Sequence, residues 1–323
     1  MFQHPIRLAA AAAFAGCVSL AHAQAIKVDE NLPAYQPVSG ISGKLSSIGS
    51  DTLNNLMTFW AEEFQKIYPN VKIEIEGKGS STAPPALIAG TSQLGPMSRK
   101  MKAEEVDAFE KKYGYKPRIV GVAIDALAVY TNKDNPLQSL TLQQVDAIFS
   151  STRKRGGQDV TTWGQLGLTG EWASKPISLY GRNSASGTYG FFKEHSMKNG
   201  DYKGSVKEQP GSASVVQGVE KELGGIGYSG IGYKTSGVKA LAISDKAGPI
   251  EATQANAESF KYPIARYLYI YINCNPSTGP DPLVKEFIRF VLSKQGQQDT
   301  AKDGYFPLPA KKAGEFLESS GCQ

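Results

Sequence analysis

The segment at 182–188, Arg-Asn-Ser-Ala-Ser-Gly-Thr, combines residue types that bind small anions. It holds one guanidinium and three hydroxyls, and its Gly-Thr pair leads into a helix predicted over 189–197. Free N–H groups at a helix N-terminus lie at the positive end of the helix dipole, so such a turn can bind a small tetrahedral oxyanion. The alternative explanation is an ordinary N-cap, where Ser and Thr are common.

Similar turns recur along the chain. Gly with Ser or Thr occupies 49–52, 77–82 and 211–214, and each of these turns precedes a predicted helix. In open α/β sheets, ligands bind beyond the carboxyl ends of the strands. We therefore predict one anion shared by several helix N-termini.

The elements that must position these turns alternate between strand and helix. Strands are predicted over 44–48, 71–76, 119–131, 177–181, 226–228 and 267–273, with a short strand ending at Leu94. Helices are predicted over 53–68, 84–89, 103–113, 142–149, 189–197, 212–223 and 282–293. This alternation predicts an α/β fold with layered sheets and helices.

Composition limits the possible classes of protein. The 323 residues are 41% hydrophobic and 20% charged, which is typical of a globular chain long enough for two domains. The net charge of +5 is mild, and the one dense basic run is the Arg-Lys-Arg sequence at 153–155. Since no basic stripe with interleaved aromatic residues is present, nucleic acid is not an expected partner.

The sequence has no recognisable set of catalytic residues, neither a nucleophile with a base nor a cluster of metal ligands. Past the N-terminal segment the single histidine is His195, and no Gly-x-Ser-x-Gly motif has a histidine partner. The Gly-Ser-Ser sequence at 79–81 lacks the lysine of a phosphate-binding P-loop, and no Cys/His cluster has metal-ligand spacing. The residues at the turns are donors, so we predict binding without catalysis, and neither a cofactor nor a metal.

The N-terminus has the pattern of an export signal. Arg7 precedes an apolar stretch at 8–20, and Ala21-His22-Ala23 fits a cleavage site, so residues 1–23 are predicted to be a signal peptide. A lipoprotein-like sequence ending at Cys17 offers the competing possibility of a lipid anchor. The cleavage site is the clearer of the two signals, so we expect a soluble exported protein.

Two cysteines, Cys274 and Cys322, follow the predicted signal peptide. An oxidising compartment permits a disulfide between them, and two unrelated free thiols are the alternative.

Taken together, the turns resemble those of the periplasmic phosphate-binding proteins of ABC transporters. The similarity lies in 49–52, 79–81, 95–99 and 182–188, and extends to 140–163, 226–228 and 287–309. It covers nearly the whole chain after the predicted signal peptide, in order. The resemblance implies a type II periplasmic-binding-protein fold, in which two α/β lobes are joined by two crossing strands and clamp a ligand between them.

The resemblance also implies lobe boundaries. A discontinuous lobe one would comprise 24–124 and 266–323, and lobe two 125–265. The crossings would fall near 123–128 and 263–267.

Carried over by motif, the resemblance implies a set of phosphate-contacting residues. They are Ser50, Asp51, Thr52, Ser80, Ser98, Arg99, Arg182, Ser186, Gly187 and Thr188. These would divide between the lobes, leaving the anion as the one group bonded to both. Many relatives have an aspartate where this chain has Ser98. We therefore hypothesise that Asp51 accepts the phosphate proton with Arg99 balancing its charge, the alternative being that Asp51 caps the helix beginning at Leu53.

The implied function is a monomeric, non-enzymatic, high-affinity receptor in the periplasm that delivers inorganic phosphate to an ABC transporter membrane permease, with secretion or surface association left open. A receptor for another tetrahedral oxyanion, such as sulfate or molybdate, is the alternative within binding proteins. An exported phosphatase and an adhesin-like or structural role are alternatives from other classes.

Overall fold

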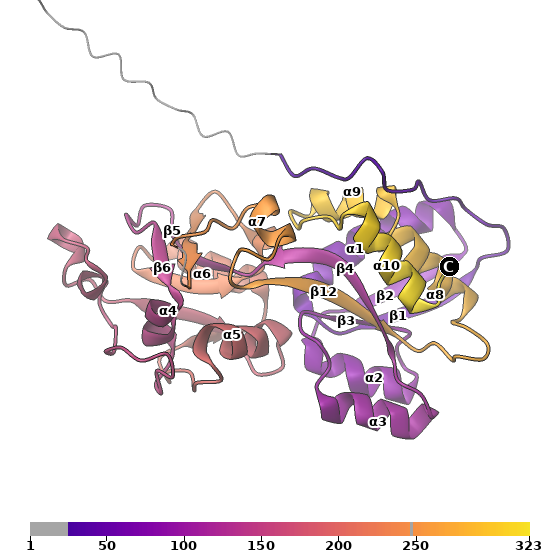
Figure 1. Ribbon diagram of the computed structural model, residues 1–323, viewed down its shortest axis with the longest axis horizontal. Helices are drawn as coiled ribbons and strands as arrows, with labels where there is room; N and C mark the ends of the chain where they lie inside the picture. Colours follow the sequence, from indigo (N-terminus) through magenta and orange to yellow (C-terminus); the bar gives the residue numbers. More distant parts are fainter. Residues whose placement is uncertain (1–24, 246–247) are drawn as a thin grey trace, which may run out of the picture.

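The computed structural model describes residues 25–245 and 248–323, so the predicted signal peptide at 1–23 lies outside the described residues. The chain forms an elongated molecule in which two α/β portions lie end to end (Figure 1). Each portion is built on its own sheet. Within the described residues, no helix has both the length and the apolar character needed to cross a membrane.

The first sheet has the strand order β2-β1-β3-β12-β4. Its members are β1 (Gly43–Ile48), β2 (Val71–Glu76), β3 (Leu94–Met97), β4 (Arg118–Ala126) and β12 (Ala265–Ile272). Strand β1 runs parallel to β2 and β3, whereas β12 is antiparallel to both β3 and β4. The carboxyl ends of β1, β2 and β3 therefore meet at one edge of the sheet, which is where the Ser-rich turns begin.

Helices cover both faces of the first sheet (Figure 1). On one side lie α2 (Ala83–Ala89) and α3 (Ala103–Tyr113), and on the other lie α1 (Asn54–Ile67), α8 (Pro282–Val291), α9 (Lys294–Lys302) and α10 (Ala310–Ser320). Prolines near the start of α2 suit a position whose N–H groups have no intrahelical partner, and Gly90 ends it in the left-handed conformation that glycine adopts at low cost. Phe109 of α3, Leu87 of α2 and Tyr269 of β12 belong to one small hydrophobic cluster, which gives this face its own core.

The second sheet has the order β10-β5-β9-β7-β8. Its strands are β5 (Ala128–Asn132), β7 (Ser178–Arg182), β8 (Lys207–Gln209), β9 (Gly225–Ser229) and β10 (Val238–Ala240). A separate parallel pair is formed by β6 (Ser139–Thr141) and β11 (Ala242–Ser244). The accompanying helices are α4 (Leu142–Phe149), α5 (Gly187–Met197), α6 (Ser212–Lys221) and α7 (Gln254–Glu258). Phe192 of α5 stacks on Tyr228 of β9 with ring centroids 3.9 Å apart, which holds α5 against the sheet.

The strand predicted over 119–131 is two strands in two different sheets. Strand β4 belongs to the first sheet and β5 to the second, with Leu127 between them. The chain returns to the first sheet at β12, and the N–H of Leu127 donates to the carbonyl of Ile264 at 3.2 Å. The mostly apolar run at 119–131 is buried on both sides of Leu127, so its hydrophobic pattern does not reveal this division.

Two other sequence predictions need correction. The short strand expected to end at Leu94 begins there, since Gly95 and Pro96 continue β3 in place of a turn, and the carbonyl of Pro96 accepts the N–H of Ser50 at 2.7 Å. The helix predicted over 282–293 corresponds to α8, but α9 and α10 follow it. Helix α9 is polar and contains a glycine, so hydrophobic periodicity does not predict it.

The proposed disulfide between Cys274 and Cys322 is wrong for this structure, which has both as buried free thiols. They lie near one another, because a Cβ placed on Gly321 would be 3.2 Å from the Cys274 sulfur. Burial raises the pKa of the Cys322 thiol to about 11, so both the access of a reagent and the supply of thiolate are limited.

We expect the unreduced protein without residues 1–23, and so without Cys17, to show two titratable thiols after denaturation and almost none while folded. The folded state hides both sulfurs, and unfolding exposes them. Titration with a chromogenic thiol reagent, with and without guanidinium chloride, measures this. Failure to detect thiols in the denatured, unreduced protein would instead show that the pair is oxidised.

Asp303, the C-cap residue of α9, has a partly buried carboxyl group. Its Oδ2 atom has no hydrogen-bond partner among the described residues, and burial raises its pKa from an ordinary 3.8 to about 7. The folded protein therefore holds a proton that the unfolded chain has lost at neutral pH. Stability falls as pH rises from the unfolded pKa through the folded one.

The substitution Asp303→Asn should remove this loss. We expect it to raise the free energy of unfolding by about 1–2 kcal/mol near pH 8 and by almost nothing near pH 3, since the carboxyl group is then mostly protonated in both states. Urea denaturation at the two pH values measures the difference. The exposed Asp134→Asn serves as control, and an equal effect of Asp303→Asn at both pH values would contradict the assignment.

Candidate functional site

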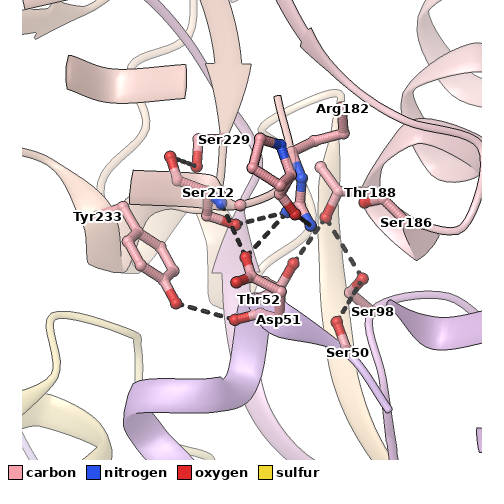
Figure 2. Close-up of polar contacts among 12 residues, drawn as sticks. Ser50, Asp51, Thr52, Ser98, Arg182, Ser186, Thr188, Ser212, Ser229 and Tyr233 are labelled. Atoms are coloured by element: carbon pink, nitrogen blue, oxygen red, sulfur yellow. Dashed lines mark hydrogen bonds and ion pairs between the residues drawn. The ribbon is translucent and has the colours of Figure 1, made fainter. Parts of the chain in front are cut away.

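The predicted turns from both portions of the molecule meet in one buried cluster (Figure 2). Ser50, Asp51 and Thr52 lie between β1 and α1, and Ser80 begins the short 3-10 helix Ser80–Thr82 after β2. Ser98 directly follows β3, whereas Arg182 ends β7 and Thr188 lies in the first turn of α5. The parallel strands place their carboxyl ends here, as expected for ligand sites in such sheets.

Hydroxyl groups form the centre of the cluster, and all of them are buried. The Ser98 Oγ atom accepts from Ser50 Oγ at 3.0 Å and from Thr188 Oγ1 at 3.3 Å. Ser80 Oγ lies 3.3 Å from Ser98 Oγ and accepts the Ser98 N–H at 3.0 Å. Thr52 Oγ1 lies 2.9 Å from Thr188 Oγ1. Ser98 is thus the centre of a network joining the turns of both sheets.

Two glycines permit this close approach. A Cβ atom on Gly187 would lie 2.2 Å from Ser80 Oγ and 2.7 Å from Ser98 Oγ. Gly79 has φ +116°, and a Cβ atom there would lie 2.5 Å from the carbonyl oxygen of Ala185. Each position needs a residue without a side chain, because any other would separate α5 from the first sheet.

Ser186 is the N-cap of α5, where its Oγ accepts the N–H of Tyr189 at 3.3 Å. Both explanations of this segment therefore apply, since the turn caps a helix and also lies within the cluster. Gly187 and Thr188 are the first two residues of the helix and are buried.

Arg182 is the guanidinium nearest the Asp51 carboxylate, and its side chain is 2% exposed. Its Nη1 donates to Ser212 Oγ at 2.7 Å and lies 3.2 Å from Asp51 Oδ2, while Nη2 donates to the carbonyl of Pro210 at 3.2 Å. Its Nε has no hydrogen-bond partner among the described residues. Burial lowers the pKa of Arg182, and the facing Asp51 carboxylate opposes that shift.

Asp51 serves a helix in the other portion of the molecule. Its Oδ2 accepts the N–H of Ser212, the first residue of α6, at 2.7 Å, and its backbone carbonyl accepts the Tyr233 hydroxyl at 2.9 Å. It makes no side-chain cap to the helix at Leu53, so that alternative is wrong. The carboxylate neutralises the positive end of α6 instead.

The expectation that Arg99 balances the charge of Asp51 is also wrong. Arg99 forms a fork with Glu105, with both nitrogen-to-oxygen distances 2.7 Å, and its Nη2 donates to Ser81 Oγ at 3.3 Å. Burial alone would raise the pKa of Glu105, but the Arg99 guanidinium holds it below its ordinary value. The balancing charge for Asp51 comes from Arg182.

Sequence reasoning missed the ion pair of Asp125 and Arg266. Both are buried, and Arg266 Nη2 lies 2.7 Å from Asp125 Oδ2. Arg266 Nη2 also donates to Thr188 Oγ1 at 2.9 Å, so this second guanidinium contacts the cluster. The available signal was a carboxylate inside the long apolar run at 118–126.

The two portions contact one another directly at the site. Asp51 with Arg182, Thr52 with Thr188, and the Tyr233 hydroxyl with the Asp51 carbonyl each join them. Hence the expectation that an anion would be the one group bonded to both is wrong. Across residues 25–245 and 248–323, no group of three or more His, Cys, Asp or Glu side chains could hold a metal ion.

Comparison with known proteins defines the class first. A model of the PBP superfamily domain matches residues 34–295. Among solved structures, the chain is similar to a putative phosphate ABC transporter substrate-binding protein with bound phosphate from Clostridium perfringens. That similarity has a TM-score of 0.68 at 29% identity and covers 82% of this chain and 100% of that one. The prediction of a type II periplasmic-binding-protein fold is confirmed.

Proteins of similar sequence identify the family within this superfamily. The chain is 58% identical to the phosphate-binding protein PstS of Pseudomonas aeruginosa over 318 residues, 98% of each chain. It is 30% identical to PstS of Staphylococcus haemolyticus, over 84% of this chain and 83% of that protein. The chain therefore belongs to the PBP superfamily and, within it, to the PstS family.

Loss of the Asp51 carboxylate should loosen the contact between the two portions. We expect Asp51→Ala to increase the radius of gyration of the protein without added ligand, since the bonds to Arg182 and to the Ser212 N–H disappear together. Small-angle scattering measures this. Glu222→Ala, which breaks an ion pair with Lys207 inside one portion, is the matched control. Superimposable profiles for Asp51→Ala and its parent would argue against a role in closure.

Proposed function

We propose that this protein is a non-enzymatic receptor that binds inorganic phosphate in the periplasm and delivers it to an ABC transporter membrane permease. The observation that carries the proposal is the convergence of buried hydroxyls from both sheets on Ser98, beside the first turn of α5. The 58% identity to a phosphate-binding protein identifies phosphate as the first candidate among tetrahedral oxyanions.

The donor set suits such an anion. Ser50 and Thr188 already direct hydroxyls at one oxygen, Ser98 Oγ, with Ser80 Oγ 3.3 Å from it, and an oxyanion oxygen among them can accept the same donors. The first N–H groups of α5 lie beside them at the positive end of its dipole. Charge-assisted hydrogen bonds of this kind are roughly twice as strong as neutral ones.

Fixed charges near the site are largely balanced. Arg182 faces Asp51, Arg266 faces Asp125 and Arg99 faces Glu105. Attraction to the anion therefore comes from short-range donors, and from the Arg182 Nε that no described residue pairs, more than from excess positive charge. Full burial of these donors also excludes the water that would compete with the anion.

A receptor that clamps its ligand needs two lobes. We assign residues 24–124 and 266–323 to lobe one and residues 125–265 to lobe two. Their separate sheets, joined through the β4–β5 passage and β12, support this division. Export by a cleaved signal peptide at 1–23 and a monomeric state complete the proposal.

Calorimetric titration of dialysed protein with phosphate, sulfate, molybdate and arsenate tests the function. We expect tight binding of phosphate and arsenate, and much weaker binding of sulfate and molybdate. A parallel assay of phosphate-ester hydrolysis tests the phosphatase alternative and should remain at the level of the buffer. Preference for sulfate or molybdate, or ester hydrolysis at a protein-dependent rate, would overturn the proposal.

Arg182 should be a strong single contributor to affinity. We expect Arg182→Ala to weaken phosphate binding by about 2–4 kcal/mol, because it removes charged donors and leaves Asp51 without its partner. Arg182→Lys should recover little, since an ammonium cannot reproduce the planar fork. Calorimetry measures both. Arg289→Ala, which disrupts the pair with Glu286, is the control. An unchanged dissociation constant for the alanine variant would remove Arg182 from the site.

Asp51 remains our candidate for the group that accepts the phosphate proton. At neutral pH phosphate carries a proton that a carboxylate can accept, whereas sulfate has none and is repelled. We expect Asp51→Asn to reduce the preference for phosphate over sulfate, measured as the ratio of the two dissociation constants. Glu105→Gln, which changes a carboxylate bonded to Arg99, should leave that ratio unchanged. Equal ratios in Asp51→Asn and the parent would limit Asp51 to joining the lobes.

A further inference from the structure

Arg266 lies on β12 directly opposite Asp125 of β4, where these two strands pass between the sheets. Both side chains are at most 2% exposed. Arg266 Nε donates to Asp125 Oδ2 at 2.9 Å, and the other carboxylate oxygen accepts the N–H of Ile231 at 2.8 Å. The guanidinium carbon also lies 5.1 Å from the ring centroid of Phe191, on α5. Carboxylate and ring together hold the guanidinium in one orientation.

The same guanidinium reaches both halves of the hydroxyl cluster. Its Nη1 donates to the carbonyl of Ser98 at 2.8 Å, and its Nη2 donates to Thr188 Oγ1 at 2.9 Å. Ser98 follows β3 of the first sheet, and Thr188 belongs to α5 beside the second. One residue on a crossing strand therefore holds a group from each side.

The contact with Thr188 sets the direction of its hydroxyl. A guanidinium can donate but never accept, so Nη2 occupies a lone pair of Thr188 Oγ1. Thr52 Oγ1, 2.9 Å away, can donate to the second lone pair, and the threonine proton then points to Ser98 Oγ at 3.3 Å. Ser98 Oγ accepts from Ser50 and Thr188, which leaves its own proton for Ser80 Oγ. Arg266 thus begins a one-way chain of hydrogen bonds.

We propose that Arg266 is a positioning residue of the oxyanion site, which acts by fixing the Thr188 hydroxyl as a donor toward the ligand. Asp125 holds the guanidinium in place and neutralises its charge. This inference rests on the proposed phosphate-binding function. A freely rotating hydroxyl would spend part of its time presenting a lone pair to the anion, so loss of its orientation weakens binding without removing a ligand contact.

A double-mutant cycle between Arg266 and Thr188 tests the proposal. We expect Arg266→Lys to weaken phosphate binding by about tenfold, since a lysine keeps the charge but cannot span Asp125, Ser98 and Thr188 together. Thr188→Val removes the hydroxyl and should also weaken binding. Because Arg266 acts through that hydroxyl, the double variant should bind within about threefold of the weaker single variant. Losses that multiply in the double variant would overturn the proposal.

Three further variants distinguish a loss of hydroxyl orientation from a general loss of structure as the cause of weaker phosphate binding. Thr188→Ser retains the hydroxyl and should preserve both the affinity and the sensitivity to Arg266→Lys. Arg155→Lys changes another largely buried arginine, bonded to the carbonyls of His195 and Ser196 at the opposite end of α5, and should leave affinity unchanged. If Arg266→Lys does not fold, Asp125→Asn replaces it in the cycle, because it weakens the support of the guanidinium while leaving Arg266 present.

The parent protein is titrated with inorganic phosphate first, and this separates the two claims. A parent that does not bind phosphate contradicts the proposed function and this inference with it. A parent that binds phosphate, with variants whose effects are independent or with an equal loss in Arg155→Lys, contradicts the positioning role alone.

Discussion

Pairing of buried guanidinium groups is the constraint on which the site depends. A buried charge without a partner is strongly destabilising, so each arginine at the site needs a carboxylate held at a fixed place. Asp51 supplies it for Arg182, Asp125 for Arg266 and Glu105 for Arg99. The partners come from different elements, and meeting this requirement brings β1, β4, β7, β12 and α3 into a single arrangement around the cluster.

The same pairing connects the site to the overall architecture. Asp51 follows β1 of the first sheet and Arg182 ends β7 of the second, so their contact closes the two portions against one another. Arg266 and Asp125 lie where the strands cross, and Asp125 also bonds Ile231, at the start of the 3-10 helix Ile231–Tyr233. The Tyr233 hydroxyl donates to the Asp51 carbonyl. One network of hydrogen bonds therefore joins the crossing strands, this 3-10 helix and the turn that contains Asp51. A movement of one lobe must break or re-form bonds within it.

Uncharged hydroxyl donors supply many of the hydrogen bonds that this site offers to an anion. Hydroxyls from Ser50, Ser80, Ser98 and Thr188 are buried and mutually bonded, so the site is preorganised at small entropic cost. Glycine at 79 and 187 makes that proximity possible, since a methyl group at either position would separate the lobes. Family membership and site chemistry therefore agree on an oxyanion as the ligand.

What the sequence by itself determined is the local chemistry and the fold class. The elements at 71–76, 103–113 and 142–149 have the predicted bounds, because periodicity and capping residues are local signals. The Ser- and Gly-rich turns also meet as expected, since parallel strands bring their carboxyl ends to one edge. The tertiary structure alone decided which charges pair. Arg99 is adjacent to Ser98 in sequence yet faces Glu105, and Asp51 caps a helix 161 residues away. The crossing of the chain between two sheets sets the partner of Asp51, and the position of α3 sets that of Arg99. No periodicity within a strand or helix records either.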